Sequence, residues 1–223
     1  MSLKHLAIGA LMAVGALVAV CTFMAQAAAQ ERERERKEEL SGIIGRTFNS
    51  DQRILGAPAY DPDLRFSNGL SFEVNYARRV MGMGRGFFSL TLEVPFVVNH
   101  DQDLHAAIPK RIPQEYASYF VTPAARLNLF AGQGVSPWVS FGGGFGHFSE
   151  SSTLLFGGHN PGPTGTNTGV LQAGLGIDVK IFRRFSLRGE ARDFWSGVPQ
   201  LNVTTDKSRQ HNIFAGGGIV WHF

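Results

Sequence analysis

Residues 85–99 read RGFFSLTLEVPFVVN, and apolar side chains occupy every second position of this segment. One face carries only apolar side chains, those of Phe88, Leu90, Leu92, Val94, Phe96 and Val98. The other face is more polar and includes Ser89, Thr91, Glu93 and Asn99. Successive side chains of a β-strand point to opposite faces of the sheet, so an alternation of this length predicts a strand rather than a helix.

The same alternation recurs from residue 40 onward. We expect eight strands, at residues 40–49, 68–80, 86–99, 116–131, 135–149, 168–182, 185–197 and 209–223. Most of them are long enough to cross a bilayer, for which a tilted strand needs about 9–11 residues. The first strand is the hardest to orient, because Ile43 and Ile44 are adjacent, and the side on which Arg46 lies stays open.

The connections between these strands alternate between short and long. The short ones are residues 81–84, 132–134 and 183–184. The long ones, which hold most of the prolines, are residues 50–67, 100–115, 150–167 and 198–208. An even number of strands brings both termini to one end of a barrel, with the short turns there and the long loops at the other end, as in membrane barrels.

The composition fits a single glycine-rich β domain. The chain has 223 residues with 27 glycines, one cysteine, 17% charged residues and a formal net charge of +3. This composition excludes a coiled coil and an acidic disordered chain, and one cysteine excludes a disulfide scaffold or a multi-cysteine metal cluster. A charge of +3 on this length forms no basic stripe, so we expect no nucleic-acid partner.

The first 39 residues predict a targeting segment and a spacer. Residues 1–29 combine a basic start, a long apolar run and small residues at its end, which is the pattern of a cleaved secretory signal peptide. An uncleaved membrane anchor is the alternative, because the apolar run is long; cleavage would remove Cys21. Residues 30–39 predict a charged periplasmic spacer, with a partner-binding arm as the alternative. Residues 40–223 predict the barrel domain.

Alternation alone does not separate a soluble barrel, with its apolar face inside, from a membrane barrel, with its apolar face outside. The polar face is rich in glycine, for example Gly174 and Gly176. Glycine weakens a solvated strand but makes room for larger side chains in a narrow lumen. The charges on this face also balance, four acids against four bases, as buried charges must. They form a predicted lumen charge network of Glu73, Glu93, Arg126, Asp178, Lys180, Arg188, Glu190 and Arg192.

The C-terminal residues also favour a membrane barrel over a soluble one. Apolar residues alternate up to an aromatic last residue at Ile219, Trp221 and Phe223, which looks like the assembly signature of outer-membrane barrels. With this signature and the strand alternation, residues 40–223 resemble the small eight-stranded outer-membrane barrels of the OmpA/OmpX type. The resemblance implies an all-β, eight-stranded, antiparallel up-and-down transmembrane barrel in the bacterial outer membrane. It further implies a monomer in contact with outer-membrane lipids and, during insertion, with the barrel assembly machinery.

An eight-stranded barrel has an interior that its own side chains fill, so the charged lumen residues predict a packed ion network; a narrow ion path or gate is the alternative. We therefore expect a non-enzymatic surface barrel without cofactor or metal. Its partner would be an extracellular ligand of the long loops, residues 50–67, 100–115, 150–167 and 198–208. A narrow porin-like channel for small solutes is the second hypothesis.

His147 and Ser149 are the sharpest hint of an enzyme. Acyl hydrolases use a serine nucleophile that a histidine activates. The His-x-Ser pair is similar to that of the outer-membrane lipid A deacylases. This chain departs from that family, because no asparagine follows Ser149, no partner glutamate is evident on the next strand, and Glu150 falls on the opposite face. We therefore assign no catalytic residue, and a lipid A-modifying acyl hydrolase is the third hypothesis. Residues 99–105 carry metal-ligand types but read as a solvated loop, since they lack the length and glycine of a calcium loop.

Overall fold

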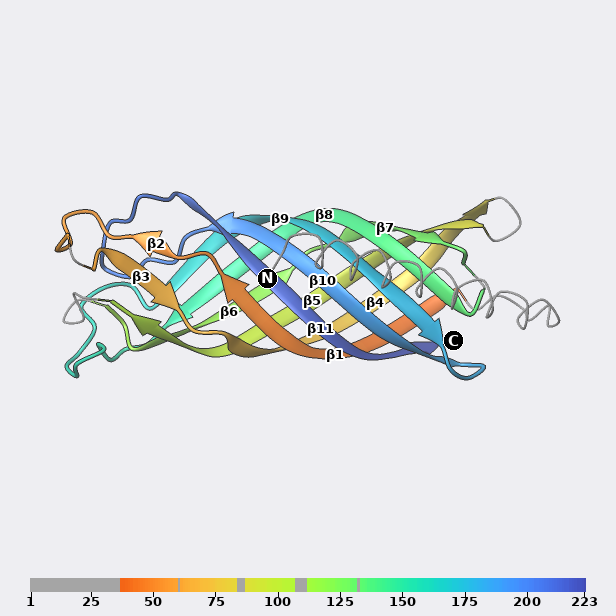
Figure 1. The fold of residues 1–223 in the computed structure, drawn as a ribbon, viewed down its shortest axis with the longest axis horizontal. Coiled ribbons are helices and arrows are strands. Elements are labelled where there is room, and N and C mark those ends of the chain that lie inside the picture. Colours follow the sequence, from red (N-terminus) through yellow and green to blue (C-terminus); the bar gives the residue numbers. More distant parts are fainter. Residues whose placement is uncertain (1–36, 60, 84–86, 107–111, 132) are drawn as a thin grey trace, which may run out of the picture.

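The computed structural model describes residues 37–223 apart from 60, 84–86, 107–111 and 132 (Figure 1). The predicted signal peptide and most of the predicted spacer lie outside the described residues. Within the described part of the chain, no helix is long and apolar enough to span a membrane.

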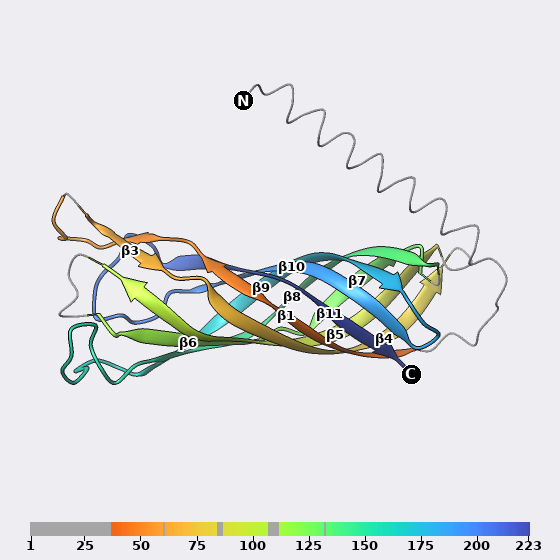
Figure 2. The same cartoon turned by 60° about the horizontal axis from the view of Figure 1, so that its bottom comes forward.

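The long strands close into a barrel (Figures 1 and 2). The first wall strand begins, and the last wall strand finishes, at the same end of the barrel. The wall consists of β1 (Glu38–Asn49), β4 (Gly69–Met83), β5 (Phe88–His105), β6 (Glu115–Val121), β7 (Ala124–Leu129), β8 (Val135–Glu150), β9 (Gly165–Lys180), β10 (Phe185–Gly197) and β11 (Arg209–His222). β6 and β7 follow one another between β5 and β8, so the wall has eight strand positions. Neighbours are antiparallel, and β11 pairs with β1, which leaves the wall without an open edge.

The eight expected strands are confirmed, with three local differences. β1 begins at Glu38, two residues before the expected start. The strand expected over 116–131 divides at Pro123, which has no N–H to donate to the ladder. The first long loop also contains two short strands, β2 (Gln52–Arg53) and β3 (Asp63–Phe66).

The loop expected at 100–115 is a correction. β5 continues to His105 and pairs there with β3 and β6, and its register shifts between Asn99 and Gln102. The shift lets the strand continue, so that Gln102 and Leu104 are buried. The segment 99–105 is therefore strand and not a solvated loop.

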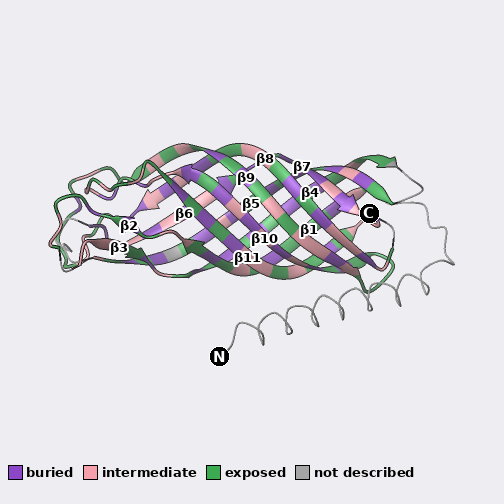
Figure 3. Cartoon of the chain, turned by 45° about the horizontal axis from the view of Figure 1, so that its top comes forward, coloured by how far each residue is buried: buried purple, intermediate pink, exposed green. Residues whose placement is uncertain are grey.

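The outer face of the barrel is apolar, and burial alternates along every wall strand (Figure 3). Exposed apolar side chains occur at every wall position, for example Ile44, Phe72, Val94, Val121, Phe141, Leu175, Leu187 and Ile219. A soluble protein rarely exposes a continuous apolar surface of this extent, whereas a membrane barrel requires one. Arg46, whose side stayed open in the sequence, lies on this outer face between Ile44 and Phe48.

The lumen has two levels. Towards the short turns it is polar and charged, as predicted. Towards the long loops, apolar side chains pack beside uncharged polar ones such as Gln102, Gln210 and Asn212, which corrects the expectation of a charged lumen throughout. We call the apolar cluster at this level the loop-end core; it comprises Ile54, Leu64, Phe66, Leu104, Ile112, Tyr116, Phe120, Phe148, Phe194 and Leu201, all at most 8% exposed. Its aromatic rings stack and meet edge-on, with Phe120 and Phe194 parallel at 4.8 Å.

One lumen glycine illustrates how the charged level fits. A Cβ atom on Gly176 would lie 2.5 Å from Cζ2 of Trp138, a side chain that is 2% exposed. The missing side chain of Gly176 therefore makes room for the indole, as the glycine-rich polar face predicted.

Candidate functional site

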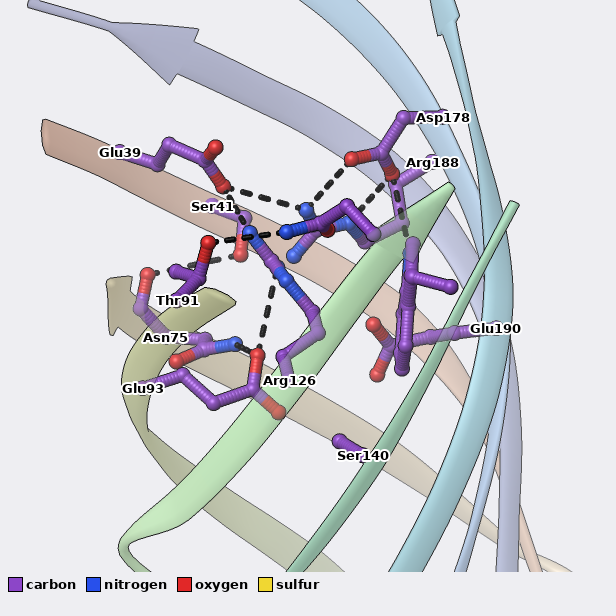
Figure 4. Close-up of polar contacts among 12 residues, drawn as sticks. Glu39, Ser41, Asn75, Thr91, Glu93, Arg126, Ser140, Asp178, Arg188 and Glu190 are labelled. Atoms are coloured by element: carbon purple, nitrogen blue, oxygen red, sulfur yellow. Dashed lines mark hydrogen bonds and ion pairs between the residues drawn. The ribbon is translucent and has the colours of Figure 1, made fainter. Parts of the chain in front are cut away.

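Ion pairs bring seven of the eight predicted lumen charges together in the turn-end half of the barrel. They are the buried Glu73, Glu93, Arg126, Asp178, Arg188, Glu190 and Arg192. Figure 4 labels five of them, Glu93, Arg126, Asp178, Arg188 and Glu190. Lys180, the eighth, is the last residue of β9 and is exposed. Four other lumen side chains belong to the same cluster and went unpredicted: Glu39, Asn75, Trp138 and Ser140.

Glu93 on β5 links three other strands. Its Oε1 accepts a hydrogen bond from Arg192 Nη1 at 2.7 Å. Its Oε2 accepts from Arg126 Nη1 at 3.2 Å and from Asn75 Nδ2 at 3.1 Å. These partners come from β10, β7 and β4, so a single carboxylate ties four of the eight wall positions. Charge-assisted bonds of this kind are stronger than neutral ones.

Asp178 and Arg188 form a two-pronged pair. Arg188 Nε and Nη2 donate to the two carboxylate oxygens, each at 2.7 Å. Trp138 Nε1 also donates to Asp178, at 3.3 Å. The guanidinium carbons of three arginines, Arg126, Arg188 and Arg192, lie 5.1–5.5 Å from the centre of the Trp138 ring. The indole is thus a central surface around which the cations gather.

Glu39 is the charged member of the cluster that the sequence did not reveal. Its carboxylate bonds to Arg126 and lies 3.4 Å from Arg188 Nη2. Glu39 stands at the end of a run of alternating charges, which obscured the strand pattern; its even spacing to Ser41 and Ile43 was the available signal. Nearer the turn end, Ser186 Oγ and His222 Nε2 are 2.9 Å apart beneath this carboxylate.

The charge balance of the connected cluster therefore differs from the sequence count. With Glu39 added, five buried acids face the three buried arginines, and Lys180 lies exposed at the end of β9. Glu73 and Glu190 converge on one donor, Arg192 Nε, at 3.1 and 2.7 Å. Among the residues that the structure describes, neither oxygen of Glu73 has a hydrogen-bond partner of acceptable geometry.

On the outer face, His147 meets a partner that the sequence did not identify. His147 Nδ1 and Asn167 Oδ1 of β9 are 2.7 Å apart. Ser149 pairs with Gly165 across the strands, and the Cε1 atom of His147 lies 3.3 Å from the position of a Cβ on that glycine. Ser149 and His147 form no hydrogen bond with each other among the described residues. Glu150 points inward, as expected, and accepts from Thr166 Oγ1 at 2.8 Å.

At the loop end, a hollow of about 550 Å³ opens beside β3 and the end of β5. Its lining is mixed and comprises Asp61, Arg65, Asp103, Leu104, His105, Ala106, Gln114, Leu155 and Phe156. Phe156 is 73% exposed, an unusual state for a large aromatic side chain. The described residues contain no group of three or more metal-ligating side chains that could hold an ion.

The fold is shared with known proteins although the sequence is not. No protein-family model and no curated protein matches the chain. The structure is similar to the crystal structure of Neisserial surface protein A, with a TM-score of 0.53 and 12% identity over 83% of this chain and 97% of that one. It is also similar to the outer membrane protein OprG from Pseudomonas aeruginosa, with a TM-score of 0.51 and 10% identity over 85% of this chain and 96% of that one. The chain therefore has the fold of the small eight-stranded outer-membrane β-barrels, with a closed wall and an apolar outer face.

Proposed function

We propose that this protein is a non-enzymatic surface barrel with a sealed lumen, whose long loops make contacts outside the cell. The observation that carries the proposal is the filling of the lumen at two levels. The charged cluster occupies the turn-end half, and the loop-end core occupies the other half. A solute would have to displace both a buried ion network and packed aromatic rings.

The loops contribute to this seal and also offer a contact surface. Ile54, Ile112 and Leu201 come from three different long loops and are at most 4% exposed. They anchor the loops on the loop-end core. The hollow beside Phe156 is lined partly by two of these anchored loops, through Asp61, Arg65 and Gln114, so a ligand would meet a partly preformed surface.

Planar-bilayer recording of the purified barrel tests the proposal against the channel hypothesis. We expect no steady single-channel currents from the wild type. A variant that removes both levels, Phe120→Ala with Glu93→Ala, serves as the positive control for opening the lumen. Steady currents from the wild type would contradict the sealed lumen and favour a narrow channel.

An acyl hydrolase, the third hypothesis from the sequence, is a further candidate, and the bond between His147 and Asn167 favours it. Sequence reasoning found no group to orient the histidine, and Asn167 supplies one at 2.7 Å. An asparagine orients the histidine in some hydrolases that use a cysteine. In this scheme Ser149 Oγ would attack an ester carbonyl while His147 Nε2 takes its proton. The leaving alcohol would then take that proton, and water would release the acyl group.

Lipid analysis of membranes with and without the protein tests this candidate. A hydrolase predicts acyl-chain loss from the outer-leaflet glycolipid that Ser149→Ala abolishes and that Ser152→Ala, in the adjacent loop, leaves intact. An unchanged acyl pattern with the wild type would remove the candidate.

A further inference from the structure

The turn between β9 and β10 combines basic and apolar side chains at the short-turn end of the barrel. Residues 180–185 read KIFRRF, and all six are exposed. Two backbone bonds close the turn: Ile181 N–H donates to Phe185 O at 3.0 Å, and Phe185 N–H donates to Phe182 O at 3.3 Å. Three cations and three apolar side chains therefore lie within one short turn, which we call the basic turn.

The basic turn lies beside the end of β11 (Figure 1). Phe185 pairs with Trp221 across the strands, and the rings of Trp221 and Phe223 are 4.7 Å apart. The next outward pair, Leu187 and Ile219, is aliphatic and belongs to the apolar belt. Aromatic side chains mark the boundary between hydrocarbon and headgroups, and the short turns of membrane barrels face the periplasm. The basic turn therefore adjoins the inner leaflet of the outer membrane.

The apolar side chains at the tip of the turn are not covered by the barrel. Ile181 is 46% exposed and Phe182 is 68% exposed. Exposed aromatic and aliphatic side chains among basic ones are typical of protein segments that lie in a membrane interface. Covering Ile181 and Phe182 with lipid removes apolar surface from water, which is favourable.

The acids of the neighbouring strands face other cations. Asp178 on β9 accepts two hydrogen bonds from Arg188, each at 2.7 Å. Glu38 at the start of β1 lies 3.8 Å from Arg78. The adjacent turn, residues 130–134, reads FAGQG and carries no charge. Three cations and no acid in the basic turn thus give this part of the barrel end a positive charge.

We propose that the basic turn binds the phosphate group of an anionic phospholipid in the inner leaflet, with Arg183 and Arg184 as the donors. Guanidinium groups bind phosphate through charge-assisted hydrogen bonds, and basic residues at a membrane surface attract anionic headgroups. Ile181 and Phe182 then pack among the lipids, whereas a soluble anion or a glycan strand would leave them exposed. The site lies outside the lumen and away from the long loops, so it stands whether or not the lumen conducts.

Trp221 provides a local reporter, because it is the cross-strand neighbour of Phe185. Of the other two tryptophans, Trp138 is buried in the lumen, and Trp195→Phe removes the outward one at the loop end. This Trp195→Phe barrel is the reference. It is placed in phosphatidylcholine vesicles that contain a small fraction of brominated phosphatidylglycerol or of brominated phosphatidylcholine. Bromine quenches a tryptophan that it contacts, so the excess quenching by phosphatidylglycerol measures its preference for the turn.

The reference should prefer phosphatidylglycerol about tenfold, because each basic residue near an anionic lipid surface contributes severalfold to binding. Replacing both arginines, Arg183→Gln with Arg184→Gln, should remove most of that preference. The pair Arg183→Lys with Arg184→Lys keeps the charge and should keep most of it. Arg53→Gln with Arg65→Gln is the matched control, since it makes the same change of charge at exposed arginines of the first long loop. It should behave like the reference.

Several outcomes would overturn the site. Equal quenching by the two brominated lipids in the reference would do so, and so would an unchanged preference in the glutamine pair. Equal losses in the turn and loop variants would show a general effect of charge, and a loss in the lysine pair would trace the preference to the shape of the turn. Loss of the preference with inorganic phosphate at the concentration of the lipid would assign the turn to a soluble anion. Co-sedimentation with purified peptidoglycan that the glutamine pair abolishes would assign it to the cell wall. Heat-dependent gel migration of each variant checks that it is folded.

Discussion

The two glutamates that face Arg192 from different strands are in opposite situations. Glu93 accepts three hydrogen bonds, from Arg126, Arg192 and Asn75, which is what a carboxylate needs when it is buried. Glu73 is equally buried but has no bond of acceptable geometry, and it shares the single Arg192 Nε with Glu190. A proton on Glu73 that is donated to Glu190 gives both carboxyl groups a partner and removes one buried negative charge. A protonated acid is the form of Glu73 that this geometry can satisfy.

This difference predicts unequal effects of the same change at the two positions. Glu73→Gln replaces a protonated acid by a neutral amide of similar shape, so we expect the free energy of unfolding to change by less than about 1 kcal/mol. Glu93→Gln removes the carboxylate charge that Arg126 and Arg192 share and should cost about 3–5 kcal/mol. Urea unfolding of both variants in vesicles measures this. Equal losses would mean that Glu73 is ionised.

Glu150 gives a prediction with a defined pH direction. It lies beyond the apolar belt at the loop end of β8, and burial raises the pKa of its carboxyl, while its bond from Thr166 lowers it in part. A raised pKa in the folded state means that stability from this group is present below the unfolded pKa and is lost as the pH rises through the folded one. Glu150→Gln should therefore be more stable relative to the wild type at pH 7 than at pH 4. A constant difference between these pH values would contradict the assignment.

At the scale of the elements, the strands followed from the sequence because one face of each must be apolar. This argument located β8 and β10 almost to the residue. It failed where alternation was masked by other constraints. The run of alternating charges before residue 40 obscured the inward position of Glu39. The adjacent Ile43 and Ile44 left the face of Arg46 undecided. The continuation of β5 was missed because polar residues such as Asn99 and Gln102 also pack inside the lumen.

The lumen cluster could be predicted in its members but not in its connections. Periodicity places a charge on the inner face, yet the pairing depends on how far neighbouring strands are shifted along one another, which one sequence does not reveal. The loop-end core was missed for a related reason. Its loop residues, such as Leu64 and Ile112, have no periodicity, and only the closed wall brings them over Phe148 and Phe120.

The glycines of the wall provide a prediction at this scale. Gly176→Val places a side chain against Trp138 and should destabilise the barrel by about 1–3 kcal/mol or more through overpacking. Gly42→Val is the control, since a Cβ there meets no atom within 4 Å and Gly42 faces outward. The control should unfold at the wild-type urea concentration. Similar losses in both variants would argue against a packed lumen around Trp138.

At the scale of the whole molecule, the barrel is the reverse of a soluble protein, which buries apolar side chains and exposes charged ones. Apolar side chains face out, charged side chains are buried inside, and buried apolar side chains are concentrated beneath the loops. This arrangement is stable in a membrane and not in water, because the exposed belt is far larger than a soluble surface tolerates. The functional proposals rest on this claim, since a surface barrel of the outer membrane and a lipid-facing His147 both require the bilayer around the wall.

Heat-dependent gel migration of an outer-membrane fraction tests that claim most directly. Folded membrane barrels resist detergent until heated, so the unheated protein should be recovered with the outer membrane and should migrate at a different position from the boiled sample. Recovery in the soluble fraction, with one gel position before and after boiling, would contradict a membrane barrel.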